Sequence, residues 1–222
     1  MCGSIKGSLA TYVLSGIAAL ALWWQRPTST DSRWLAMFLL TFSTMQLVDA
    51  GIWVALQHHV PQLNRFLSRF VLPMVLLAEL WVNYVCAVCL AGRSRSHTWE
   101  AILAAFSAGT VVLWYSSCER PTVCMTTTTV TTDTVVADRR LLWCDQTIHC
   151  VGRVLFFVLL MWPVLQAFPA GSLRGILLTT LMLTFVHAYP RKDFGSHWCW
   201  SSNSMAILVL IDLCISSRYL KL

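Results

Sequence analysis

The sequence contains few charged residues. Charged side chains make up 12% of its 222 residues and hydrophobic side chains 57%, whereas a soluble domain carries roughly 25% charged residues. The mean hydropathy is +0.64. This composition excludes a disordered chain, a coiled coil and an ordinary cytosolic enzyme, and it indicates a multi-pass membrane protein.

Motifs that mark particular activities are also absent from the sequence. It contains no glycine-rich phosphate loop, no nucleophile elbow and no HExxH metal motif. Its basic residues do not form a run interleaved with aromatic residues, as they do in many nucleic-acid-binding proteins. We therefore favour a protein without enzymatic activity, with a membrane enzyme left open as an alternative, and we expect no metal, no cofactor and no binding of nucleic acid.

Long apolar segments are what the sequence does contain. Seven of them reach or approach the length of about 20 residues that a helix needs to cross a bilayer, and they cover residues 7–25, 34–56, 70–92, 101–118, 154–173, 175–190 and 198–217. Their apolar runs are continuous, which favours helices over the alternating strands of a membrane β-barrel. We expect one all-α membrane domain over residues 1–222, built as a seven-transmembrane-helix bundle, with six or eight spans as the alternatives.

The basic residues of the short loops bear on orientation, because lysine and arginine favour the cytoplasmic side. Leaving out the long loop after the fourth segment, one face of the bundle holds Arg26, Arg33, Arg93, Arg95, Arg174, Arg218 and Lys221. The other face holds Lys6, Arg65, Arg69, Arg191 and Lys192. The difference favours an N-terminus outside the cell or in a lumen and a C-terminus in the cytoplasm.

The loop between the fourth and fifth segments, about residues 118–150, differs from the others in length and composition. Residues 122–137 include eight threonines and four valines, and these β-branched residues favour strands. The cysteine pairs 118/150 and 124/144 are both centred on residue 134. We therefore predict a small extramembrane β-hairpin that folds at residues 133–135 and places the cysteines of each pair opposite each other.

The four cysteines of this loop have three possible states. On an oxidising side of the membrane they are disulfide candidates, as Cys118–Cys150 and Cys124–Cys144. The alternatives are free thiols and a four-cysteine zinc site, although structural zinc sites usually have cysteines only two to four residues apart.

Three acidic residues lie inside predicted spans: Asp49, Glu79 and Asp212. A carboxylate at mid-membrane costs about 2.5–3.5 kcal/mol on insertion scales, and such residues often mark ion or substrate routes. Helical spacing places Gln46 on the same face as Asp49, and Asn83 on the same face as Glu79. Asp212 likewise shares its face with Ser216. These spacings predict an inward-facing acidic seam, and the alternative is that the same side chains only bond helices together.

The three acids are also predicted to lie at different depths, from Asp49 in the outer half through Glu79 to Asp212 in the inner half. No lysine or arginine lies inside a predicted span, so we expect the acids to have no cationic partner. If the second, third and seventh helices touch, the acids form a proton or cation relay, and Gln46 and Asn83 orient them.

Histidine and tryptophan lie mainly near span ends. His187, near the end of the sixth segment, is a candidate member of the polar site, although a single histidine there is commonly an interfacial residue. The tryptophans at span ends are Trp23, Trp24, Trp34, Trp99, Trp114 and Trp198. This placement predicts an aromatic belt at the membrane interfaces.

Two short motifs resemble those of an uncharacterised family of seven-span membrane proteins of large DNA viruses and protists. The first is A-Y-P at residues 188–190 followed by F-G-S-H-W-C-W-S-S-N at residues 194–203. The second is the stripe Gln46, Asp49 and Trp53, where Glu is commoner than Asp in that family. The resemblance implies a seven-span layout and supplies no activity. Microbial rhodopsins share the Tyr189-Pro190 feature, but Ser216 stands where their retinal-binding lysine is needed.

Two functions are consistent with these features. The first is a proton- or cation-coupled transporter, or a small-ligand-binding helix bundle, that uses Asp49, Glu79, Asp212, Gln46, Asn83 and His187. The alternative is a non-catalytic structural or assembly subunit of a membrane complex. The expected partners are the lipid bilayer, a small ligand or ion, and another membrane protein. The sequence identifies neither the ligand nor the membrane.

Overall fold

The computed structural model describes residues 4–118, 122–131, 134–142, 150–188 and 194–219. Its long helices are α1 (Ile5–Gln25), α2 (Thr30–Gln57), α4 (Leu72–Cys89), α5 (His97–Ser117), α6 (Cys150–Ala167), α7 (Ser172–Ala188) and α8 (Phe194–Tyr219). A short helix α3 (Pro61–Phe66) and a π-helical turn η1 (Leu67–Val71) lead directly into α4. The predicted apolar segments correspond to these helices, although segment 70–92 begins in η1 and ends beyond α4, and segment 154–173 extends past the end of α6 into the start of α7. The fold is therefore predominantly α-helical.

The starts of the helices follow from local sequence signals. Ser4, Ser29 and Ser96 are extended N-cap residues, and each accepts a hydrogen bond from a backbone N–H of the first turn. Acidic residues follow two of these caps, Asp31 in α2 and Glu100 in α5, where they complement the helix dipole. These caps satisfy donors that the helix itself leaves unpaired.

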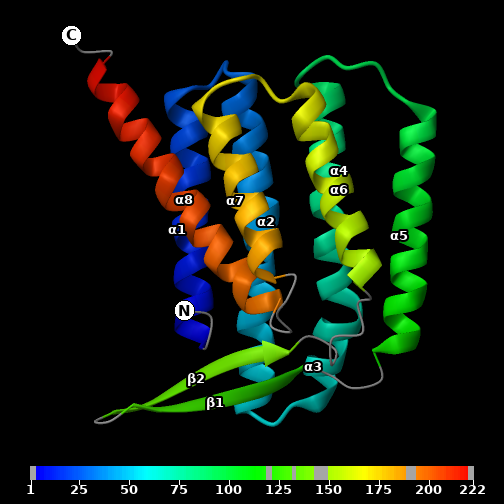
Figure 1. The fold of residues 1–222 in the computed structure, drawn as a ribbon, viewed down its shortest axis with the longest axis vertical. Helices are drawn as coiled ribbons and strands as arrows, with labels where there is room; N and C mark the ends of the chain where they lie inside the picture. Colours follow the sequence, from blue (N-terminus) through cyan, green and yellow to red (C-terminus); the bar gives the residue numbers. More distant parts are fainter. Residues whose placement is uncertain (1–3, 119–121, 132–133, 143–149, 189–193, 220–222) are drawn as a thin grey trace.

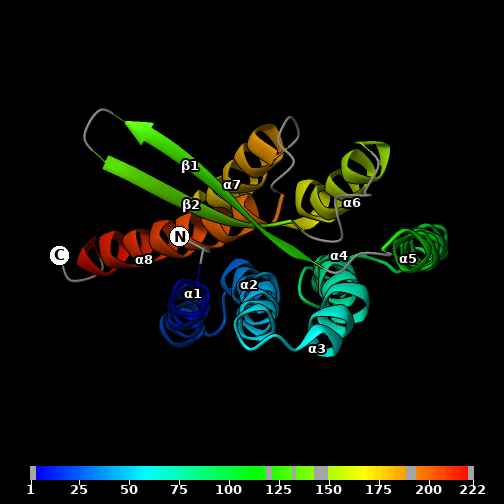
Figure 2. The same cartoon turned by 90° about the horizontal axis from the view of Figure 1, so that it is seen from below.

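The helices form two layers, with α1, α2 and α4 in one and α6, α7 and α8 in the other (Figure 2). Helix α2 is central, because it packs against α1, α4, α7 and α8. Successive long helices run in opposite directions, so the N-terminus lies at the lower end of the bundle and the C-terminus at the upper end (Figure 1). Helix α5 lies at the edge, where it packs on α4 and η1.

Small residues allow α1 to approach α2 closely. The buried side chains of α1 are Ser8, Thr11, Ser15, Ala18, Ala19 and Leu22. Small side chains at helix contacts are typical of membrane bundles, in which close van der Waals packing replaces the hydrophobic effect. The opposite face of α1 exposes large apolar residues, among them Val13, Ile17 and Leu20 at 55%, 51% and 68%.

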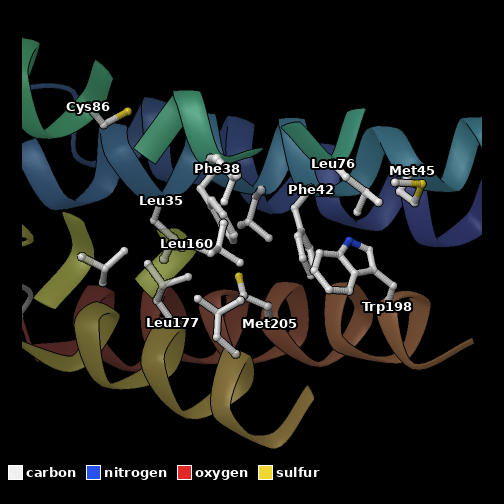
Figure 3. Close-up of a cluster of buried hydrophobic side chains, with 14 of the residues drawn as sticks. Leu35, Phe38, Phe42, Met45, Leu76, Cys86, Leu160, Leu177, Trp198 and Met205 are labelled. Carbon is white, nitrogen blue, oxygen red and sulfur yellow. The ribbon is translucent and has the colours of Figure 1, made fainter. Parts of the chain in front are cut away.

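The core between the two layers is aromatic and aliphatic. Phe38 and Phe42 of α2 face Trp198 and Met205 of α8, with Leu160 of α6 nearby (Figure 3). The rings of Phe42 and Trp198 have centroids 4.7 Å apart. The core is therefore filled by side chains from helices of both layers.

Three helical segments are long and apolar enough to cross a membrane: Ile5–Gln25, Thr30–Gln57 and Pro61–Cys89. Shorter apolar helices cover Gly152–Ala167, Ser172–Val186 and Trp200–Ser216. These helices, together with the apolar residues exposed on the outside of the bundle, indicate a membrane protein.

Strands β1 (Val123–Thr131) and β2 (Thr134–Leu142) pair in antiparallel fashion at the lower end of the bundle. Thr131 pairs with Thr134, and Cys124 pairs with Leu141. The predicted register, with a fold at 133–135 and Cys124 opposite Cys144, is therefore wrong. The physical reason is that backbone hydrogen bonding along the whole ladder, up to the pair Thr131 and Thr134, sets the register, and the symmetry of the cysteines does not.

Candidate functional site at the centre of the bundle

The central feature is Glu79 of α4, whose side chain is completely buried. Its Oε1 accepts a hydrogen bond of 3.2 Å from Nε1 of Trp198 on α8. Its Oε2 has no hydrogen-bond partner among the described residues. Glu79 is therefore a carboxyl group inside the bundle with one oxygen satisfied and one oxygen open, and a buried polar atom left in this state is uncommon in native proteins.

The surroundings of Trp198 are apolar. Its ring lies 4.7 Å from that of Phe42 and 5.8 Å from those of Phe156 and Phe157, measured between centroids. The indole therefore presents its polar N–H to Glu79 while its ring packs among aromatic residues from α2 and α6. This packing fixes the donor in place and excludes bulk water from its neighbourhood.

One turn further along α4, Asn83 joins three helices. Its Oδ1 accepts a hydrogen bond of 2.8 Å from Nε1 of Trp34 on α2, and its Nδ2 donates one of 2.9 Å to the backbone carbonyl of Leu160 on α6. Pro163 lies in the same stretch of α6 and removes one backbone N–H from that helix. Asn83 thus has a donor and an acceptor partner, in contrast to Glu79.

The prediction of an interfacial belt is corrected for three tryptophans by their burial. Trp34 and Trp198 were expected in an interfacial aromatic belt, but both are completely buried and donate hydrogen bonds to buried polar residues of α4. Trp114 is also buried, whereas Trp24 is 88% exposed as a belt residue would be. Position near a span end does not separate the two roles, because the neighbouring helix decides whether the indole is covered.

Gln46 and Asp49 are buried on α2, as the inward-facing seam requires, but they lie at another level. The Trp34–Asn83 hydrogen bond and the approach of Gly51 to Leu67 give the offset between the antiparallel helices α2 and α4. This offset places Glu79 level with about residue 38 of α2, some ten residues or about 15 Å from the level of Asp49. The two acids therefore do not meet.

Asp212 lies near the upper end of α8 and has a cationic partner. Its Oδ2 accepts from Nη2 of Arg26 at 3.2 Å, and the same Nη2 donates to Ser216 at 2.7 Å. The expectation that none of the three acids is paired with a cation is therefore wrong for Asp212. Arg26 is the C-cap residue of α1, outside the apolar segment, and the close packing of α1 on α8 brings it to Asp212.

Several predicted residues cannot be placed in the site. The side chains of His187, Cys124, Cys144 and Cys150 lie outside the described part of the chain. Cys118 is buried and disulfide-bonded, but its partner is not among the described side chains. The pairings Cys118–Cys150 and Cys124–Cys144 stay predictions.

A second buried polar cluster, which sequence reasoning missed, lies at the lower end of the bundle. Ser68 donates to Oδ1 of Asn64 at 2.9 Å and lies 2.7 Å from Oγ1 of Thr122, while Asn64 donates to the carbonyl of Thr122 at 2.8 Å. Trp114 of α5 donates to the carbonyl of Ser68. The signal in the sequence was weak, because Asn64 and Ser68 precede the apolar run and Thr122 is one of many threonines.

Among the described residues, no three His, Cys, Asp or Glu side chains come together in a way that could hold a metal ion. In comparisons with known proteins, no family model, no curated protein and no solved structure matches this chain.

Proposed function

We propose that this protein is a multi-pass integral membrane protein in which α1, α2, α4, α5, α6, α7 and α8 cross the bilayer. Three of these helices have the length and hydropathy for it, and large apolar residues cover the outside of α1. The opposite positions of the two termini are consistent with an odd number of spans (Figure 1). In this arrangement the N-terminus and the strands β1 and β2 share the outer or lumenal side, and the C-terminus is cytoplasmic.

Within this bundle, Glu79 is the proposed centre of a proton- or cation-coupled transport or small-ligand-binding function. The observation that supports it is the open Oε2 of a completely buried carboxyl group. Intramembrane carboxyl groups are costly and commonly serve ion and proton pathways. Trp198 orients the group through Oε1, so Oε2 is the oxygen that takes up the proton or cation.

The proposal is narrower than the seam of three acids. Asp212 is paired with Arg26, and Asp49 lies about 15 Å below the level of Glu79 along the bundle. Gln46 and Asp49 then lie on the route of the proton or cation between Glu79 and the outer side. Asn83 holds the helices around Glu79 in register.

The test is pH-dependent proton or cation flux in liposomes containing the purified protein. We expect Glu79→Gln to abolish the flux, because the amide keeps the hydrogen bond from Trp198 but takes up no proton. Asp212→Asn is the matched control, since it makes the same chemical change at an ion-paired site, and it should leave flux within about twofold of wild type. Equal loss of flux in the two variants would contradict the central role of Glu79.

A second measurement does not depend on knowing the transported species. Infrared difference spectra between two pH values report a carboxylic acid that gains or loses a proton. The band assigned to a buried acid should be present in wild type and Asp212→Asn, and absent in Glu79→Gln. A spectrum unchanged by Glu79→Gln shows that this residue does not exchange protons.

The alternative function is a structural or assembly subunit of a membrane complex. It is favoured by the way Asn83 and Asp212 join helices through satisfied hydrogen bonds and an ion pair. In that case Glu79→Gln changes neither the proton nor the cation flux measured in liposomes. Purification of wild type and variant in mild detergent then recovers the same stable complex.

A further inference from the structure

The edge helix α5 contacts α4 at its upper end and η1 at its lower end, and it leaves a groove against α4 between these contacts. At the upper end, Tyr84 of α4 donates to Oε1 of Glu100 on α5 at 3.0 Å. At the lower end, Trp114 donates to the carbonyl of Ser68, and Arg69 donates to the carbonyl of Tyr115. Between these contacts the helices line a shallow, open apolar groove of about 580 Å³.

The walls of this groove are apolar and partly open to the outside of the bundle. They include Met74, Ala78 and Trp81 of α4 and Ala108, Val111 and Val112 of α5. Met74 and Val112 are 53% and 65% exposed. Near the upper end of the groove, Nε1 of Trp81 donates to Oγ of Ser107 at 3.2 Å, so this polar pair is satisfied across the helices.

These cross-links limit what the groove accepts. A transmembrane helix has a diameter of about 10–12 Å with its side chains, and it cannot enter a groove whose two walls are hydrogen-bonded to each other at both ends. A flexible hydrocarbon chain can enter from the side, and the volume lies in the range of about 300–1,000 Å³ that is usual for small-ligand sites.

Below the groove, the same face of the chain carries aromatic and basic residues. Phe66, Phe70 and Tyr115 are about half exposed, with ring centroids 6.0 Å apart for Phe66–Phe70 and 5.5 Å apart for Phe70–Tyr115. The guanidinium of Arg69 lies 4.5 Å from the centroid of the Tyr115 ring. Aromatic and arginine side chains in this arrangement are typical of the membrane–water interface.

Among the described residues, no acid forms an ion pair with Arg65 or Arg69. The two residues are one helical turn apart. The other basic group near α5 differs, because Arg95 at the upper end is paired with Glu100. In the described part of the chain, the lower end of the groove therefore presents unpaired positive charge, which is complementary to an anionic head group.

The dimensions also agree with a lipid. Arg69 and Trp81 are twelve residues apart on one helical path, about 18 Å, whereas one leaflet of the hydrocarbon core is about 15 Å thick. We propose that the groove between α4 and α5 binds one acyl chain of an anionic phospholipid, with its phosphate held by Arg65 and Arg69. The inference rests on the proposed insertion in a bilayer but not on Glu79.

The test uses phosphatidylglycerol with brominated acyl chains, added to the detergent-purified protein. Bromine quenches a nearby indole, and the difference between wild type and Trp81→Phe isolates the contribution of Trp81. We expect quenching of Trp81 to saturate in wild type and in Glu79→Gln. The variant with Arg65→Gln and Arg69→Gln should require about tenfold more lipid, and so should wild type with brominated phosphatidylcholine.

Matched substitutions separate the groove from general effects. Ala108→Phe fills the groove and should remove the quenching, whereas Ala105→Phe, on an exposed part of α5 outside it, should not. Arg93→Gln with Arg95→Gln is the control for the loss of positive charge. Native mass spectrometry should count one retained phosphatidylglycerol in wild type and the controls, and none in Ala108→Phe.

Two results would overturn the proposal. The first is equal quenching of Trp81 by the two lipids, with no change on substitution of Arg65 and Arg69. That result shows that acyl chains contact Trp81 without a specific head-group site. The other is a dimer of this chain that Ala108→Phe dissociates, which assigns the groove to a second copy. Retention of the lipid in Glu79→Gln distinguishes this test from that of the proposed transport function.

Discussion

Glu79 and Asp212 are both acids on long helices, yet they differ in burial and in their hydrogen-bond partners. Glu79 lies at the centre, completely buried, with a single described hydrogen bond from an uncharged donor. Asp212 lies at the upper end, where Arg26 supplies a charge and also bonds Ser216. The lower end resembles the upper one, because Asn64, Ser68 and Thr122 bond one another.

The comparison teaches that Asp212 and the cluster of Asn64, Ser68 and Thr122 have polar partners at the ends of the bundle, whereas one oxygen of the central carboxyl group has none among the described residues. A group that is only partly satisfied adds little stability for its cost. Asn83, one turn away, shows that a polar side chain at the centre can be satisfied when its shape matches its neighbours.

The largest expected effect on stability comes from Asn83→Leu. This change leaves the buried Nε1 of Trp34 without its acceptor and the carbonyl of Leu160 without the side-chain donor. We expect a loss of about 2–3 kcal/mol in the free energy of unfolding, because each buried group left unsatisfied costs about 1–3 kcal/mol. Equilibrium unfolding in mixed detergent micelles measures it. A loss no larger than that caused by Glu79→Gln would remove the distinction between the two central residues.

Ser68→Ala should destabilise the lower end by about 1–2 kcal/mol, since the hydroxyl bonds Asn64 and the backbone N–H and Oγ1 of Thr122. The loss should be local, with faster hydrogen exchange in η1 and at the start of β1. Ser116→Ala is the control, because that hydroxyl is exposed and bonds only within its own helix. Faster exchange spread over all helices would show that the lower cluster is not a separate region.

Asp212→Asn should cost less, about 0.5–1 kcal/mol, because both partners of the ion pair retain some exposure. The loss should shrink as salt is added, since exposed charges are screened. Unfolding of wild type and variant at low and high ionic strength checks this prediction. If Asp212→Asn lowered the free energy of unfolding by more than Asn83→Leu does, polar contacts at the upper end would contribute more stability than those at the centre, contrary to this prediction.

The smallest effect concerns acidification at the upper end of α5. A hydrogen bond from Arg95, followed by one from Tyr84, lowers the pKa of Glu100 below its ordinary value of 4.5. A lowered pKa means that this contact contributes stability above that value and loses it as the pH falls through the pKa of the folded protein. Hydrogen exchange in the first turns of α5 should therefore rise only under acidic conditions. Glu100→Gln should remove the pH dependence, and a persistent dependence would assign it to another group.

Much of the fold could be predicted from the sequence. The apolar segments, the serine caps and the spacing of Glu79 and Asn83 on one helix face are local properties, set by the helical period and by the length of each run. The burial of Gln46 and Asp49 also agrees with their predicted inward-facing stripe. The register of β1 and β2 was mispredicted, because the spacing of the cysteines does not determine which backbone groups of the two strands pair.

Only the tertiary structure decided which polar groups meet. Trp198 reaches Glu79 across 119 positions of sequence, and Arg26 reaches Asp212 across 186. Helical spacing relates residues within one helix, but it says nothing about which helices become neighbours or how they are offset along their axes. That choice depends on the packing of small residues between α1 and α2 and of aromatic residues between the layers. This packing places Glu79 at the centre with Oε2 unpartnered among the described residues, and it places Arg26 beside Asp212.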